Sequence, residues 1–184
     1  YLQAEEEAEK ICVYLCKTGL CYGVISEDTD ILAYFNEHSI SNINITKGTY
    51  KYININTLLK EFNYNKKTFL DFCIMCGNDY NPNIYRIGNT KSYKLLNKYG
   101  CIENIDKMTD LNITILNFIN TRKLFYIHIS ELDNIYKTDI SIIKNKLNKK
   151  YTMSEIKIIK NNLKNFFFVN NIKLSSEIII DNIF

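Results

Sequence analysis

Apolar residues recur along the first third of the chain with two different spacings. Between Ala4 and Leu15 they lie three to four positions apart, which predicts an amphipathic helix. Between Ile43 and Ile55 they alternate with polar residues around Lys47-Gly48, which predicts a β-hairpin. The short apolar run from Cys21 to Ser26 predicts a strand that is buried on both faces. This part of the chain therefore mixes helices with strands.

The remaining two thirds has mostly helical spacing. We expect Asn56 to cap a helix that ends at Phe62, and Asn65 to cap the next one. Further helices are predicted at Lys91–Tyr99 (ended by Gly100), Ile102–Lys107, Asn112–Tyr126, Ile140–Leu147 and Ser154–Phe168. Strands come first and helices then dominate, which predicts an α/β domain with a mainly parallel central sheet, continued by a helical module.

Composition excludes several classes of protein. Of the 184 residues, 46% are apolar, which predicts a packed core, and no apolar run is long enough to span a membrane. No export leader is visible, so we expect an intracellular protein whose six cysteines are free thiols. Cys73 and Cys76 form a CxxC pair, but no second pair accompanies them, which argues against zinc. The net charge of +3 does not by itself indicate a nucleic-acid binder, although lysines are concentrated after Ile140.

Acidic residues stand where a sheet-based active site would place them. Asp28 and Asp30 directly follow the predicted strand that ends at Ser26, and two-residue spacing in an extended segment points both side chains to one side. Glu7 and Glu9 have the same spacing after a predicted strand at Tyr1–Gln3. Asp79 follows an apolar helix in Gly77-Asn78-Asp79-Tyr80. Any one acidic pair is most simply a solvated loop, but three such groups favour a shared site.

Clustered carboxylates repel one another unless protons or cations lie between them. Hard divalent cations prefer oxygen ligands, and two such ions can activate water and stabilise a leaving oxygen at a phosphodiester. The sequence contains no P-loop, no GxGxxG and no arrangement typical of a serine or cysteine hydrolase. Divalent metal chemistry on phosphate is therefore the favoured hypothesis.

Four motifs together resemble the flap endonuclease/XPG family of structure-specific nucleases. They are YLQAEEEAEKICVYL at the start of the chain, Ser26–Asp30, Phe69–Tyr80, and Ile84–Gly88 followed by Lys91–Tyr99, which matches the helix-two-turn-helix signature. The resemblance extends from Tyr1 to about Tyr126. It implies a PIN-like 5′ nuclease fold, with the nuclease core in residues 1–80, the helix-two-turn-helix module in 81–130 and a lysine-rich helical extension in 131–184.

The resemblance also implies roles for individual residues. The metal ligands and catalytic residues would be Glu7, Glu9, Asp28, Asp30 and Asp79, with Asp79 acting through a water. They would hold two Mg²⁺ ions, for which Mn²⁺ is an expected substitute, and a K⁺ ion is implied at the helix-two-turn-helix segment. The DNA-binding residues would be Arg86, Gly88, Lys91, Lys94 and Lys98. Branched or flapped DNA is the implied partner, recognised by its shape and phosphates.

The sequence departs from the family pattern at several points. Arg86 stands where the family usually has glycine, and Asn89-Thr90 replaces Pro-Lys. The family's amino-terminal half is not visible, so we expect the chain to be an excerpt of a longer protein that acts in replication or repair, in the nucleus or at a viral replication site in the cytoplasm. Glu177–Phe184 faintly resembles a sliding-clamp-binding tail. Two alternatives remain open: a non-catalytic module that binds branched DNA or scaffolds partners, and a relative that cuts RNA.

Overall fold

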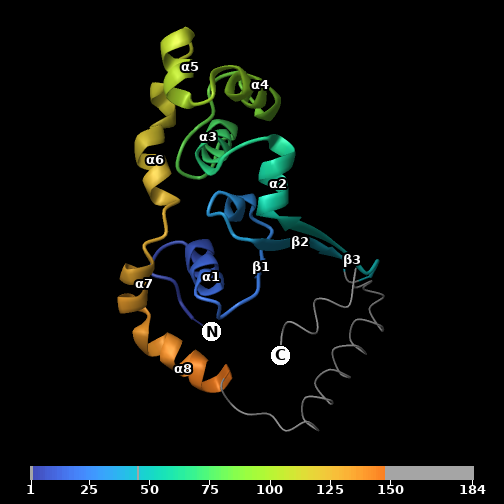
Figure 1. Cartoon of the computed structure of the whole chain (residues 1–184), viewed down its shortest axis with the longest axis vertical. Coiled ribbons are helices and arrows are strands. Elements are labelled where there is room, and N and C mark those ends of the chain that lie inside the picture. The colour runs from blue at the N-terminus through green and yellow to red at the C-terminus, as the bar shows by residue number, and fades with distance from the viewer. Residues whose placement is uncertain (1, 45, 148–184) are drawn as a thin grey trace.

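The computed structural model describes residues 2–44 and 46–147 (Figure 1). In chain order its elements are α1 (Ala8–Lys17), β1 (Val24–Ile25), the 3₁₀ helix η1 (Thr29–Leu32), β2 (His38–Asn44), β3 (Thr49–Asn54), α2 (Ile55–Phe62), α3 (Lys66–Cys76), α4 (Asn89–Tyr99), α5 (Ile102–Met108), the 3₁₀ helix η2 (Thr114–Leu116), α6 (Phe118–Leu124), α7 (Ile129–Ile135) and α8 (Lys137–Leu147). Within these residues, no helix has the length and apolar character needed to cross a membrane.

The sheet has three strands in the order β1-β2-β3. β1 pairs with β2 in parallel, with Val24 opposite Ser39, while β2 and β3 form the predicted antiparallel hairpin. The mixed α/β class is thus confirmed, with one parallel and one antiparallel pairing. The expected burial of β1 on both faces is wrong: Val24 is 5% exposed and Ile25 is 68% exposed. Side chains alternate along a strand, and only the Val24 side packs against the core around α1.

Side-chain caps fix where two helices begin. The Asn65 Oδ1 atom accepts a hydrogen bond from the Thr68 N–H at 2.9 Å, as predicted for the start of α3. The cap of α2 is Asn54, not Asn56, since Asn54 Oδ1 accepts from the Thr57 N–H at 3.0 Å. The predicted start of this helix was therefore two residues too late.

Two other predictions differ from the structure. Leu2 and Gln3 form no strand. The single helix expected from Asn112 to Tyr126 is divided into η2 and α6, because Asn117 has a left-handed backbone with φ of 41°. The predicted helix at Ser154–Phe168 and the tail at Glu177–Phe184 lie outside the described residues.

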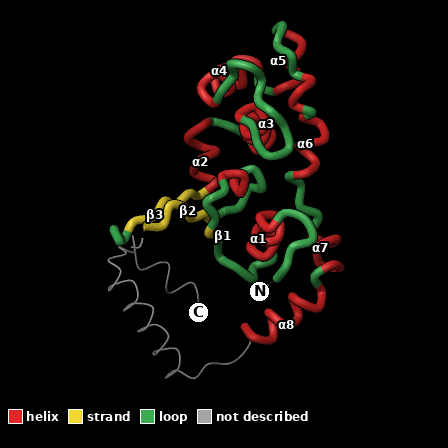
Figure 2. Tube along the Cα trace, turned by 180° about the vertical axis from the view of Figure 1, so that it is seen from behind, coloured by secondary structure: helices red, strands yellow, loops and turns green. Residues whose placement is uncertain are grey.

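Two hydrophobic clusters hold the fold together. The first is formed by α2, α3, α4, α5 and η2, and it runs from Ile55 to Leu116, so it crosses the domain boundary predicted at residue 80. The second joins α1, β1 and η1 to the segment from Phe125 to Ile140. Figures 1 and 2 show α7 lying beside α1, so the end of the described chain returns to cover its beginning.

Candidate active site

The segment that carries Glu7 and Glu9 is anchored to α7 and its C-cap residue. Glu7 is the N-cap residue of α1, but its side chain makes no capping hydrogen bond, and Glu9 lies in the first turn. The Glu5 N–H donates to the Tyr136 hydroxyl at 2.9 Å, and the Tyr14 hydroxyl hydrogen-bonds to Asp133 of α7. The exposed Glu7 carboxylate is therefore held in place by the backbone yet remains available to a ligand.

Asp28 and Asp30 lie at the start of η1. Asp28 Oδ1 accepts a hydrogen bond from the Asp30 N–H at 2.8 Å, and the Asp28 N–H donates to Ser26 Oγ at 3.1 Å. The two residues do not lie in one extended segment as predicted, because Asp28 is the N-cap residue of η1 and Asp30 lies in its first turn. Asp28 is exposed and Asp30 is half-buried.

Asp79 lies in a loop that asparagine side chains hold rigid. Asn78 Oδ1 accepts from the Tyr80 N–H at 2.9 Å, and Asn78 Nδ2 donates to Asn81 Oδ1 at 2.7 Å. Asn81 is buried, and its Nδ2 atom donates to the carbonyl of Ile74 in α3 at 2.9 Å. The exposed Asp79 side chain is thus presented from a fixed backbone at the end of α3.

The Asp30 carboxyl group interacts electrostatically with acidic side chains from all three segments. The pKa of the Asp30 carboxyl is raised to about 6, mainly by burial and also by the carboxylates of Asp28, Asp79 and Glu7, while a hydrogen bond from the Asp79 backbone works in the opposite direction. Three stretches that are distant in the sequence therefore place negative charge around one half-buried carboxyl group. The role of these carboxylates as metal ligands stays a prediction.

Two tyrosines, which the sequence analysis did not single out, lie within the same acidic neighbourhood. The hydroxyl oxygens of Tyr34 and Tyr80 are 3.5 Å apart. Burial raises the pKa of Tyr34, and Glu7, Asp30 and Glu9 raise it further. Burial also raises the pKa of Tyr80, together with hydrogen bonding to Tyr34 and Glu7. The one feature of the sequence that could have indicated Tyr80 as a site residue is its place in the Gly-x-Asp-Tyr motif.

The five acidic residues do not form a complete coordination shell. Among the residues that the structure describes, no group of three or more His, Cys, Asp or Glu side chains could hold a metal ion together. The donor set nevertheless fits a hard divalent cation, because it consists of carboxylate oxygens that repel one another around Asp30. The six cysteines are all free thiols, in agreement with the sequence analysis.

The predicted DNA-binding residues gather at the start and along one side of α4. Lys91, Lys94 and Lys98 are all exposed, and their spacing of three and four places them on neighbouring positions of the helix surface. Gly88 is the N-cap residue of α4, and a Cβ added there would have no atom within 4 Å, so this side of the turn is open. Arg86 is exposed and has a left-handed backbone, with φ of 61°.

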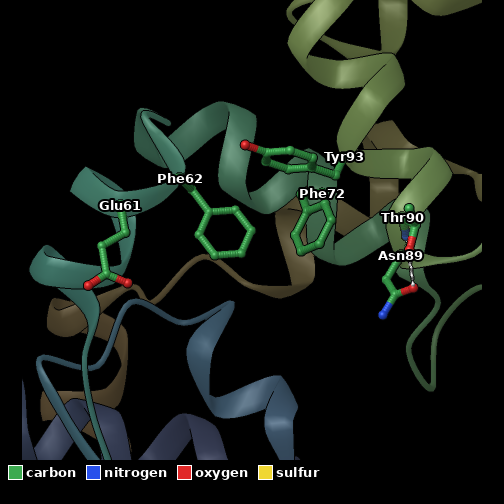
Figure 3. A pocket seen from close by; sticks show the side chains of 6 residues that line it. All are labelled: Glu61, Phe62, Phe72, Asn89, Thr90 and Tyr93. Atoms are coloured by element: carbon green, nitrogen blue, oxygen red, sulfur yellow. Dashed lines mark hydrogen bonds between the residues drawn. The ribbon is translucent and has the colours of Figure 1, made fainter.

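A hollow of about 460 Å³ lies beside the N-terminus of α4 (Figure 3). The rings of Phe62, Phe72 and Tyr93 face it, and the Thr90 N–H donates to Asn89 Oδ1 at 2.8 Å on its far side. The two residues that depart from the family's Pro-Lys pattern thus line an aromatic hollow.

Comparison with known proteins agrees with these motifs. Residues 1–79 match the family model of the XPG I-region. A probable RAD2-like endonuclease of Invertebrate iridescent virus 6 is 44% identical over 139 residues, which cover 68% of this chain and 33% of that protein. Flap endonuclease 1 of Cryptosporidium muris is 35% identical over 139 residues, covering 67% of this chain and 29% of its own length.

The fold has solved relatives as well. The flap endonuclease-1 from Methanococcus jannaschii superposes with a TM-score of 0.57 at 25% identity, over 68% of this chain and 38% of that one. The catalytic core of Rad2 in complex with DNA substrate superposes with a TM-score of 0.54 at 22% identity, over 58% of this chain and 35% of that one, which shows the fold alone.

The architecture therefore defines this chain as a mixed α/β protein with the 5′ nuclease fold. The matches place it in the flap endonuclease/XPG family. The chain spans about a third of the length of the curated relatives that it matches.

Proposed function

We propose that this chain forms the internal part of a nuclease that hydrolyses phosphodiester bonds in flapped or branched DNA with the help of divalent metal ions. The observation that carries the proposal is the gathering of acidic side chains from three distant stretches around Asp30. The names of the relatives, flap endonuclease and RAD2-like endonuclease, support the same substrate class.

The residues that would hold the metal are Glu7, Glu9, Asp28, Asp30 and Asp79, the last through a water. When bound, two Mg²⁺ ions, or Mn²⁺ in their place, would supply an activated water and stabilise the charge on the leaving oxygen. The chain's own contribution is to hold mutually repelling carboxylates close together. Glu7 also contributes to the raised pKa of Tyr80, and hydrogen bonds from asparagine side chains support the backbone of the Asp79 loop.

DNA would be held by its backbone along α4. Arg86, Lys91, Lys94 and Lys98 would contact phosphates, and the open side of Gly88 would allow close approach of the duplex. Main-chain carbonyls of this segment would hold the proposed K⁺ ion. The proposed division of labour keeps residues 1–80 for catalysis, 81–130 for DNA binding and 131–184 as an extension, whose clamp-binding tail lies outside the described residues.

The biological setting that we propose is DNA replication or repair, in the nucleus or at a viral replication site in the cytoplasm. The viral relative and the flap endonucleases among the matches support this range.

The test uses the longer protein that contains this chain and a flapped DNA duplex. Cleavage should require Mg²⁺ or Mn²⁺, and Asp28→Asn or Asp30→Asn should reduce the rate by at least about 100-fold, because each substitution removes an anionic metal ligand. Asp106→Asn is the matched control, since Asp106 is an exposed acidic residue of α5, outside the acidic neighbourhood. Undiminished cutting by both Asp28 and Asp30 variants would refute the assignment of these ligands.

One observation favours a second candidate function, a non-catalytic module that binds branched DNA. Among the described residues, the acidic side chains do not form a group ready to hold a metal ion. A Mg²⁺ titration distinguishes the two functions, because a scaffold should bind branched DNA without cutting it at any Mg²⁺ concentration. A comparison of DNA and RNA flaps in the same assay would identify an RNA-cutting relative.

A further inference from the structure

A tight turn lies directly before α4. Its two end residues are buried, and its two central side chains are exposed. The Ile87 N–H donates to the Ile84 carbonyl at 2.9 Å, which closes a four-residue turn. Ile84 and Ile87 are 5% and 9% exposed, and both belong to the first hydrophobic cluster. The two central residues, Tyr85 and Arg86, are therefore held above the surface by anchored neighbours on each side.

Arg86 adopts a backbone conformation that favours glycine. Its φ of 61° lies in the left-handed region, and a positive φ at the third position of a turn is typical of glycine or asparagine. The turn therefore carries a long cationic side chain where its backbone would suit a residue without one. A backbone held in this region makes the side chain of Arg86 a candidate for a functional role.

Tyr85 gives that cation a fixed position. Tyr85 is 79% exposed, and the Arg86 guanidinium carbon lies 5.0 Å from the centroid of its ring. Within residues 2–44 and 46–147, Arg86 forms no ion pair with any carboxylate. The guanidinium is thus oriented on an aromatic face, while its charge remains available to an external anion.

The pair adjoins the lysine side of α4. Ile87, Lys91 and Lys94 line one groove of about 470 Å³, so the turn and these lysines share a stretch of surface. Arg86 directly precedes Ile87 in the turn, and the acidic residue that also lines the groove is Asp110. A polyanion with regularly spaced charges matches such a row of cations better than a small anion does.

We propose that Tyr85 and Arg86 act as one stacked unit that grips the duplex arm of branched DNA, with Arg86 contacting a backbone phosphate and Tyr85 as the residue that positions it. The inference rests on the proposed function, which gives Arg86 a phosphate contact, and adds Tyr85 as the residue that positions the guanidinium group for that contact. Planar guanidinium groups bind phosphate through two parallel N–H donors, so fixing the plane of the group improves the contact.

The test measures binding of the chain to a synthetic duplex with one single-stranded flap, by fluorescence anisotropy at several NaCl concentrations without divalent metal. Arg86→Ala should weaken binding and make the slope of log K against log salt shallower by about one, because one phosphate contact is lost. Tyr85→Ala should weaken binding by about 2- to 5-fold, whereas Tyr85→Phe should bind like the wild type because the ring is kept.

A double substitution tests whether the two residues act together. In the Arg86→Ala background, Tyr85→Ala should cause no further loss, since the ring acts through the guanidinium. Lys123→Ala and Tyr126→Ala are the matched controls, because both side chains are exposed on or next to α6. Arg86→Gly should raise the melting temperature while lowering DNA affinity, since it relieves the backbone and removes the contact.

Unchanged binding and salt slope in Arg86→Ala would overturn the inference, as would an equal loss in Tyr85→Phe and Tyr85→Ala. A different result would refute the proposed function: metal-dependent cutting that is unchanged in both Asp28→Asn and Asp30→Asn. Normal DNA binding by the Arg86 variants together with loss of cutting in the aspartate variants would overturn this inference alone.

Discussion

Arg122 forms a two-pronged ion pair with Asp71: its Nε donates to Asp71 Oδ1 at 2.7 Å, and its NH2 group donates to Oδ2 at 2.7 Å. The Asp71 side chain is fully buried, and it also accepts a hydrogen bond from the Ile102 N–H at 3.2 Å. Arg122 further donates to Glu103 at 2.6 Å. One guanidinium group therefore joins α3, α5 and α6.

Removal of Arg122 should be among the most damaging single changes to the fold. Arg122→Ala should lower the free energy of unfolding by about 3 kcal/mol, because it leaves the Asp71 carboxylate buried without its cation. Lys123→Ala, at the exposed next position, should change it by less than about 0.5 kcal/mol. Urea denaturation of both variants measures the difference, and equal effects would contradict the assignment.

Glu103 should make stability depend on pH in the acid range. Hydrogen bonds from Arg122 lower the pKa of Glu103 to about 2 from 4.5, so the unfolded chain takes up a proton before the folded one. The stabilisation is fully present above about pH 4.5 and is lost as the pH falls through about 2. Because the Glu103 side chain is 36% exposed, we expect at most about 1 kcal/mol. Urea unfolding at pH 5 and pH 3 should show a smaller pH effect in Glu103→Gln, and parallel curves would argue against the pairing.

Asp30 should have the opposite effect in the metal-free protein. Its pKa is raised from 3.8 to about 6, so the folded state keeps a proton that the unfolded state has already lost, and stability falls as the pH rises between these values. Above about pH 6 the full cost remains. Asp30→Asn should therefore stabilise the metal-free chain by about 1 kcal/mol at pH 7.5 and by much less at pH 4.

Thermal melts with and without Mg²⁺ measure this effect. Added Mg²⁺ should raise the melting temperature of the wild type more than that of Asp30→Asn, because the variant has lost a ligand. Identical melts of the two proteins at pH 7.5 without metal would mean that Asp30 is not under electrostatic strain.

Gly77 should tolerate substitution less well than another glycine with similar backbone geometry. Gly77 has a φ of 88°, and an added Cβ would lie 1.6 Å from Asn83 Oδ1, whereas Gly19 has a φ of 75° with nothing within 4 Å. Gly19→Ala should cost about 1 kcal/mol from backbone strain alone, and Gly77→Ala about 2 to 3 kcal/mol because Asn83 must also move. Equal costs in denaturant titrations would show that the crowding at Asn83 is relieved without penalty.

Short-range signals predicted the local structure well. The Asn65 cap, the hairpin around Lys47-Gly48 and the end of α4 at Gly100 each depend on a few neighbouring residues, and the structure confirms all three. The cap of α2 was misplaced because Asn54 and Asn56 are both suitable side chains, and only the position of the chain after β3 decides between them.

Long-range contacts could not be predicted in the same way. The Arg122–Asp71 pair joins residues 51 positions apart, and nothing in either local sequence indicates the partner. The shared acidic site around Asp30 stays a prediction that rests on three motifs in a known order, whereas no motif indicated the hydroxyl contact between Tyr34 and Tyr80. The exposure of Ile25 likewise depends on which face of β1 other elements cover.

The return of α7 to the side of α1 has a consequence for biosynthesis. The ribosome makes Glu7, Asp30 and Asp79 early, but the partners of Tyr14 and of the Glu5 amide, Asp133 and Tyr136, are translated about fifty residues after Asp79. In the nascent chain, α1 therefore lacks its contacts with α7 until those residues have left the exit tunnel. A polypeptide that stops before Phe125 should be cleaved within α1 by a protease faster than the complete chain.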